Sequence, residues 1–304
     1  MKILITGIGG FVGPYLQACL KDQGHEVFGF ERTHKEPSKT IFYGDILNLQ
    51  DIDRAMAETA PDAVVHLAGF SSAQKSFDEP ELCHRINVQG TQNLLDSCMQ
   101  LKQKPRLLLI SSAEIYGKPQ FTPLTEEHSL DPTSPYGQSR LDQEKLVESY
   151  QKDLEIIIIR SFNHTGPAQQ PLFVVPDFVK QLIEIEKGIK PPILSVGNLE
   201  AVRDFTDVRD IVKAYAKALT HAKPGQVYNL CSGVGRSIQQ ILDQMIQFSG
   251  LEVDLKQDPA RLRPSDIPTL IGSHEKFTRT TGWIPAIPFE QTLIDMLNWW
   301  RVHI

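Results

Sequence analysis

A tyrosine and an arginine four positions apart, Tyr136 and Arg140 in the stretch SPYGQSR, are the first candidates for chemistry. Residues i and i+4 share one face of a helix, so the phenol and the guanidinium can lie together. A neighbouring cation stabilises the phenolate form of a tyrosine, which makes the phenol a useful acid near neutral pH. The pair therefore indicates proton transfer, although many enzymes that use tyrosine in this way have lysine at the second position.

A glycine-rich turn, TGIGGFVG at residues 6–13, follows the first apolar run directly and opens the first helical pattern. Glycines at such positions allow a tight turn, close approach of the backbone to a pyrophosphate, and packing of helix on strand. Free N–H groups at the start of the next helix attract phosphate. The segment predicts a dinucleotide site whose contacts are Gly7, Gly10, Phe11, Val12 and Gly13.

Further cofactor contacts are expected where later strands end. Glu31 closes the second strand, where an acidic residue binds ribose hydroxyls and favours NAD. Arg32 follows at once and could instead meet the extra phosphate of NADP, so NAD and NADP both stay open. The other predicted cofactor contacts are Asp45, Ile46, Leu67, Ala68 and Gly69.

The elements that must position these residues alternate along the chain. Apolar runs at 2–6, 25–30, 62–68, 106–112 and 154–162 predict buried strands, and helical patterns at 11–23, 51–59, 80–100 and 136–152 separate them. Strand and helix in alternation predict an α/β fold, a Rossmann-type doubly wound parallel sheet covered on both faces. We expect an NAD(P)-binding domain at 1–165, with segments near 203–231 returning to it. A smaller, mainly helical substrate lobe is expected at 166–304.

Composition excludes several classes of protein. The length of 304 residues, the hydrophobic content of 41% and the net charge of −6 are typical of an ordinary globular protein. The sequence has no cluster of basic residues that would indicate binding of nucleic acid. No run approaches the roughly 20 apolar residues of a membrane span. The start lacks the features of a signal peptide, and the four cysteines have no CxxC spacing. We therefore expect a cytoplasmic protein with reduced thiols and no metal site.

Six motifs follow one another in the chain: TGIGGFVG, HLAG, NVQGTQNLL, SSAEIYG, SPYGQSR and RSFNHTGP. With them the chain resembles, almost from end to end, the extended short-chain dehydrogenase/reductases that act on nucleotide sugars. In the second half, VGNLEAVRDFTDVRDIVKAY, VYNLCSG and RLRPSD resemble the members that reduce GDP-4-keto-6-deoxy-hexoses, and less closely the GDP-mannose 4,6-dehydratases.

This resemblance implies an activity and an assembly. The 4-keto group of a GDP-sugar would be reduced by hydride from NAD(P)H, with NADP slightly favoured, to a GDP-D-rhamnose type product. The helices near 81–100 and 137–152 would pair across a two-fold axis in a homodimer.

The resemblance also implies roles for single residues. Ser112 would hydrogen-bond the sugar carbonyl, Tyr136 would deliver the proton, and Arg140 stands where the family has lysine. Phe162 and His164 would line the nicotinamide pocket. The expected substrate contacts, beside Ser112, are Asn163, Lys180, Arg203, Arg263 and Asp266. Elementary chemistry agrees, because a reduced ketone develops charge on oxygen and needs donors there, while arginine suits a diphosphate.

Arg140 leaves three interpretations open. Arginine keeps the charge and does the work of lysine, or it points into solvent and the enzyme is slow, or the chain binds its ligands without catalysis. The first is favoured, because Ser112 and the glycine-rich turn are both present.

Glu114 leaves the reaction open. It lies two residues after Ser112, where the related dehydratases carry the base that removes a proton from carbon 5 of the sugar. The related reductases can also have glutamate there, and a 4-epimerase would use the same serine and tyrosine. The alternatives to a reductase are therefore a dehydratase, an epimerase or a silent binding protein. Stoichiometric use of NADPH or NADH distinguishes the reductase.

Overall fold

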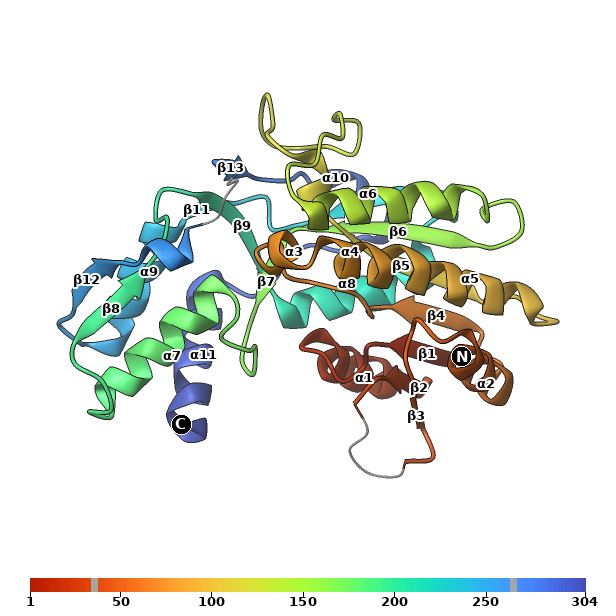
Figure 1. Ribbon diagram of the computed structural model, residues 1–304, viewed down its shortest axis with the longest axis horizontal. Helices are drawn as coiled ribbons and strands as arrows, with labels where there is room; N and C mark the ends of the chain where they lie inside the picture. The colour runs from red at the N-terminus through yellow and green to blue at the C-terminus, as the bar shows by residue number, and fades with distance from the viewer. Residues whose placement is uncertain (34–37, 263–266) are drawn as a thin grey trace.

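A computed structural model describes residues 1–33, 38–262 and 267–304 of the chain. Its first lobe is built on a seven-stranded parallel sheet of order β10-β6-β5-β4-β1-β2-β3 (Figure 1). These strands read as nearly continuous apolar runs, such as Ile156–Ile159, because both faces of a parallel sheet are buried. The predicted α/β, Rossmann-type fold is confirmed. The strands are β1 Lys2–Thr6, β2 Glu26–Glu31, β3 Ile41–Tyr43, β4 Ala63–His66, β5 Arg106–Ser112, β6 Ile156–Ser161 and β10 Val227–Leu230.

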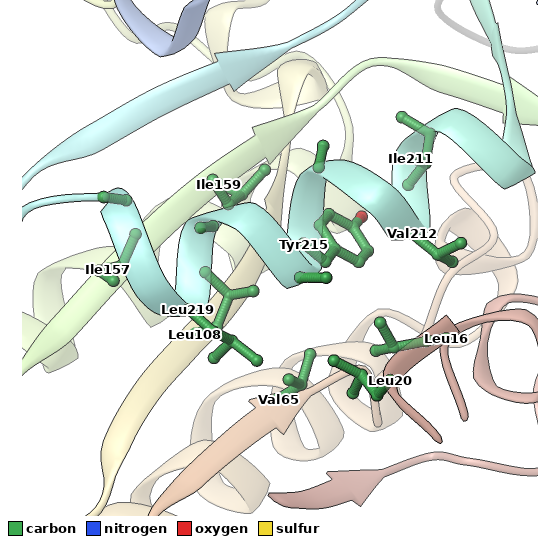
Figure 2. Close-up of a cluster of buried hydrophobic side chains, with 14 of the residues drawn as sticks. Leu16, Leu20, Val65, Leu108, Ile157, Ile159, Ile211, Val212, Tyr215 and Leu219 are labelled. Atoms are coloured by element: carbon green, nitrogen blue, oxygen red, sulfur yellow. The ribbon is translucent and has the colours of Figure 1, made fainter. Parts of the chain in front are cut away.

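One face of this sheet is covered by α1 (Val12–Asp22) and α8 (Val208–His221), and α10 (Glu275–Thr281) packs beside them. Figure 2 shows Leu16 of α1 and Tyr215 and Leu219 of α8 gathered over Val65 and Leu108 of the sheet. The α8 side chains recur every three or four residues, which gives the helix one apolar face. Each large side chain buried in this way contributes about 1.5–3 kcal/mol.

The opposite face is covered by α2 (Leu49–Thr59), α5 (Gly90–Gln100) and α6 (Pro135–Glu148). Where the sequence predicts one helix over 80–100, the structure has α4 (Pro80–His84), a π-helical turn and then α5. The π turn, Arg85–Gln89, places the buried Asn87 so that its Oδ1 accepts from Phe70 N at 2.8 Å. This bond ties the helical face to the loop that connects β4 with the short α3 (Lys75–Asp78).

The second lobe has its own apolar core, to which Phe178, Leu242 and Leu293 contribute. Its elements are α7 Val174–Glu186, α9 Ile238–Ser249, α11 Phe289–His303 and the strand pair β8 Ile193–Val196 with β12 Asp254–Gln257. A small sheet lies between the lobes in Figure 1, formed by β11 Gly235–Ser237, β9 Val202–Asp207 and β13 Thr269–Leu270, with β7 Asn163–Thr165 on β9. After β9 the chain returns to the first lobe, where β10 pairs with β6.

Among the helices in the described part of the chain, none combines the length and apolar character that crossing a membrane requires.

Candidate active site

A cavity of about 780 Å³ opens at the carboxyl ends of the central strands. Ligands of open parallel sheets bind at this edge, where the loops after the strands converge. Every residue that the sequence predicts as catalytic or as a cofactor contact lines this cavity, and so does Asn163. The fold thus brings together residues from nearly the whole first lobe.

The other predicted substrate contacts are placed differently. Lys180 lies on α7 with its side chain 40% exposed, in an ion pair with Glu184 at 3.7 Å, and it does not line the cavity. Arg203 is buried on β9, beside the cavity wall. Arg263 and Asp266 lie outside the described residues, so their roles stay predictions.

The glycine-rich turn has the shape that a pyrophosphate needs. Gly7 has a φ of +74°, and a Cβ there would come within 2.7 Å of Ala68 N. At Gly13 a Cβ would collide with the carbonyl oxygen of Ile8. The backbone of the turn therefore packs directly against the loop after β4 and against Ile8, and the start of α1 stays open to a ligand. Glu31, nearly buried at the end of β2, lies so close to Gly9 that any side chain at Gly9 would strike its carboxylate. These residues fit a dinucleotide.

The predicted proton donor is fixed by the start of α6. Ser134 caps the helix by accepting from Gly137 N at 3.0 Å, and Pro135 follows at the first helical position. Tyr136 N donates to Ser76 Oγ at 3.1 Å, which holds the backbone of the tyrosine against α3. The phenol is thereby directed at the cavity from a rigid element.

Ser112 ends β5 and begins a short 3-10 helix, Ala113–Tyr116. Its Oγ accepts from Glu114 N at 3.2 Å. A hydroxyl that accepts one bond keeps its own proton for a second partner. Ser112 can therefore donate to a ligand in the cavity, where Glu114 is half-buried beside it.

Arg140 lies inside the cavity and not in solvent. Its side chain is 94% buried, and its Cζ lies 5.3 Å from the centroid of the Tyr136 ring. Nη1 donates to Ile110 O at 3.2 Å and to Gln143 Oε1 at 2.9 Å, and Nη2 donates to Phe70 O at 3.4 Å. The buried Nε has no hydrogen-bond partner among the described residues.

A directional row of hydrogen bonds continues behind Arg140. Gln143 Nε2 donates to Thr91 Oγ1 at 2.6 Å, and Thr91 donates its only proton to Asn87 O at 2.6 Å. His66 Nε2, 2.9 Å from Thr91 Oγ1, must therefore carry the ring proton, and Nδ1 accepts from Thr6 Oγ1 at 2.7 Å. Burial, and to a smaller extent the charge of Arg140, lowers the pKa of His66 to about 3. The ring is therefore neutral, and it holds Thr6 and Thr91 together in the interior.

Sequence reasoning missed Gln143, Thr91 and Asn87, although two signals were available. Gln143 stands three residues after Arg140 on the same helix, and the other two belong to the motif NVQGTQNLL. Their contacts join α6 to segments far away along the chain, and no spacing predicts those.

Phe162 and His164 form a further part of the wall. The His164 ring stacks on Phe11 with centroids 6.4 Å apart and planes at 8°. Its Nδ1 lies 3.1 Å from Phe162 O, and burial lowers the pKa of the imidazole. A neutral, stacked histidine suits the edge of a planar ligand.

Comparison with known proteins decides the family. The family model described as GDP-mannose 4,6 dehydratase matches residues 4–296. The chain belongs to this family. The predicted likeness to nucleotide-sugar dehydrogenase/reductases is thereby confirmed, and with it the prediction of an NAD(P)-dependent enzyme.

Individual nucleotide-sugar enzymes resemble this chain over its full length. The chain is 32% identical to GDP-6-deoxy-D-mannose reductase of Pseudomonas aeruginosa over 307 residues, which cover 100% of this chain and 98% of that protein. The structure of RMD from the same organism complexed with NADPH superposes with a TM-score of 0.89 at 31% identity, covering 100% and 99% of the two chains. A UDP-glucose 4-epimerase of Thermus thermophilus in complex with NAD gives a TM-score of 0.90 at 28% identity, with both chains fully covered.

The second lobe also contributes apolar residues to the cavity wall, and sequence reasoning missed them. Phe173, Val174 and Pro176 come from the start of α7, and Phe205 comes from β9. Phe205 lies beside Asn163, its partner on the neighbouring strand β7. In the described ranges, no group of three or more histidine, cysteine, aspartate or glutamate side chains could hold a metal ion.

Proposed function

We propose that the protein reduces the 4-keto group of a GDP-4-keto-6-deoxy-hexose to a GDP-D-rhamnose type product. One observation carries the proposal: a single cavity brings the glycine-rich turn together with Ser112, Tyr136 and Arg140. The full-length similarity to GDP-6-deoxy-D-mannose reductase supports the choice of substrate.

In this proposal the glycine-rich turn holds the cofactor diphosphate, and Glu31 with Asp45 holds the adenosine end. Bound NAD(P)H supplies the hydride. Ser112 donates a hydrogen bond to the ketone oxygen, and Tyr136 gives that oxygen its phenolic proton as negative charge develops there. Arg140, next to the Tyr136 ring, stabilises the phenolate until a proton returns from water.

A second candidate reaction is favoured by Glu114. Its carboxylate lines the same cavity two residues after Ser112. If bound NAD(P)+ first oxidised carbon 4 of GDP-mannose to a ketone, this carboxylate could remove the proton at carbon 5 and drive loss of the 6-hydroxyl as water, and the same hydride would then return to carbon 6. That dehydration, like 4-epimerisation, consumes no reducing equivalents. A silent binding protein is the least supported alternative, since Arg140 is held at the cavity by three acceptors.

The test follows NADPH and NADH absorbance at 340 nm with GDP-4-keto-6-deoxy-D-mannose and identifies the product by NMR. One equivalent of cofactor oxidised per GDP-D-rhamnose formed supports the reductase. Absence of oxidation, with GDP-mannose converted to the 4-keto sugar instead, would select the dehydratase.

We further propose a cytoplasmic homodimer. All four cysteines are free thiols, which suits a reducing compartment. The α4 helix packs on α6, and the outer sides of these helices with α5 would form the contact. A sedimentation mass of one chain, 34.2 kDa, would contradict the dimer.

A further inference from the structure

Two arginines stand opposite each other in the small sheet between the lobes. Arg236 on β11 pairs directly with Arg203 on β9 in the antiparallel register. Facing residues of such a pair point to the same side of the sheet, with Cβ atoms about 4.5–5.5 Å apart. The two arginine side chains therefore leave the sheet as neighbours on one face.

The same side of the sheet continues into the cavity wall. Leu270 of β13 pairs with Arg203, and Asn163 of β7 pairs with Phe205, two residues further along β9. Alternate residues of a strand share a face, so all of these side chains lie on one surface. Leu270, Phe205 and Asn163 line the cavity, and the two arginines extend that surface at its end.

The guanidinium of Arg236 is held in place without being neutralised. Its Cζ lies 4.8 Å above the Phe289 ring, and that ring stacks on the cavity residue Phe205 with centroids 5.7 Å apart. A cation–π contact orients the group but does not satisfy its N–H donors. Nη1 of Arg236 is buried without a hydrogen-bond partner, and no carboxylate among residues 1–33, 38–262 and 267–304 forms an ion pair with it.

We propose that Arg236 is a second diphosphate-binding cation of the substrate site, acting together with Arg203. The inference rests on the proposed function in so far as the ligand is a nucleoside diphosphate sugar. Two guanidinium forks match the oxygens of a diphosphate. Lys180, the other predicted cation in the described part of this lobe, is already paired with Glu184.

The test is calorimetric titration of the full chain with GDP, GMP and guanosine. Arg236→Met keeps an apolar stem on Phe289 but removes the charge, and Arg279→Met, at an exposed position on α10, is the matched control. We expect Arg236→Met to weaken GDP binding by about ten- to a hundredfold, the scale of lost charge-assisted hydrogen bonds. The loss should be smaller for GMP and absent for guanosine. NADPH affinity should stay unchanged, and Arg236→Lys should recover part of the GDP affinity.

Each other result is decisive. Unchanged GDP affinity in Arg236→Met overturns the inference, and equal losses for GDP, GMP and guanosine overturn it in favour of contacts to the base. If Arg236→Met does not fold, inorganic diphosphate must still compete with GDP on the wild-type protein, and failure to compete overturns the site. A wild-type protein that binds GDP through Arg236 but oxidises no NAD(P)H with the 4-keto sugar would refute the reductase and leave this site standing.

Discussion

Nη1 of Arg140 donates a hydrogen bond to Oε1 of Gln143 at 2.9 Å. This bond is the first of a chain of hydrogen bonds that all run in one direction. Gln143 donates to Thr91 Oγ1, and Thr91 donates to Asn87 O. These bonds fix the orientation of the Gln143 amide, because Nε2 must donate to Thr91 and Oε1 must accept from Arg140. The surroundings of residue 140 are thus matched to a guanidinium.

Arg140→Lys should therefore lower kcat by about tenfold or more. A lysine ammonium is a point charge on a flexible stem, so it cannot reach Ile110 O, Gln143 and Phe70 O together as the planar fork does. Loss of one such buried contact costs about 1–3 kcal/mol. Steady-state kinetics with saturating cofactor measures the effect, and Arg85→Lys, exposed on the π-helical turn, is the control. Equal or faster turnover in Arg140→Lys would mean that charge alone matters.

Much of this arrangement follows from the sequence, and the limits have a physical cause. Alternating apolar runs such as 106–112 and 154–162 are enough to predict the parallel sheet, because strands buried on both faces must be apolar. The cavity follows next, since the loops at the carboxyl ends of parallel strands must converge. Position along the chain therefore places Gly7, Ser112 and Tyr136 together.

The contacts that hold Arg140 could not be predicted in the same way. Thr91, which bonds Gln143, follows the π turn at Arg85–Gln89, and no spacing rule anticipates such a turn. Likewise, Arg236 faces Arg203 only in the particular register of β11 on β9. Both relationships depend on tertiary packing between segments far apart along the chain.

Tyr136→Phe should reduce kcat by about two to four orders of magnitude, the scale of a lost general acid. NADPH affinity should stay close to that of the wild type, because the ring and its helix remain. Tyr116→Phe is the contrasting variant: Tyr116 OH donates to Asn229 Oδ1 at 2.7 Å in the buried interior. That change should lower the free energy of unfolding by about 1–3 kcal/mol and leave turnover within a few-fold. Comparable kcat losses in the two variants would remove Tyr136 from its proposed role.

Glu31→Gln should shift the cofactor preference towards NADPH. The Glu31 carboxylate stands at the end of β2 against the glycine-rich turn, where it can accept from ribose hydroxyls and repels a 2′-phosphate. We expect the ratio of kcat/KM for NADPH to that for NADH to rise by about tenfold, equivalent to about 1.4 kcal/mol. Arg32→Gln, at the exposed neighbour, should move the ratio in the opposite direction. A ratio that does not change in Glu31→Gln would show that the carboxylate does not meet the ribose.

The neutral His66 should make the protein less stable in mild acid. Burial first and the Arg140 charge second lower its pKa from 6.5 to about 3 in the folded protein. Between these values the unfolded chain binds a proton that the folded protein excludes, so stability falls as the pH falls through this window. From this residue alone, the free energy of unfolding should drop by about 1.4 kcal/mol between pH 7.5 and pH 5.5.

Urea denaturation of the wild type and of His66→Gln at the two pH values isolates this contribution. The variant should be less stable at pH 7.5, by about 1–3 kcal/mol, because its amide cannot reproduce both bonds to Thr6 and Thr91. Its further loss of stability at pH 5.5 should nevertheless be smaller than that of the wild type by about 1.4 kcal/mol. His164, whose pKa burial also lowers, contributes equally to both proteins and cancels in the comparison. His221→Gln, at an exposed position on α8, is the control and should retain the full wild-type pH dependence of stability. If the His66 ring of the folded wild type instead took up its proton near pH 6.5, His66→Gln would show the same pH dependence as the wild type, and the prediction would be wrong.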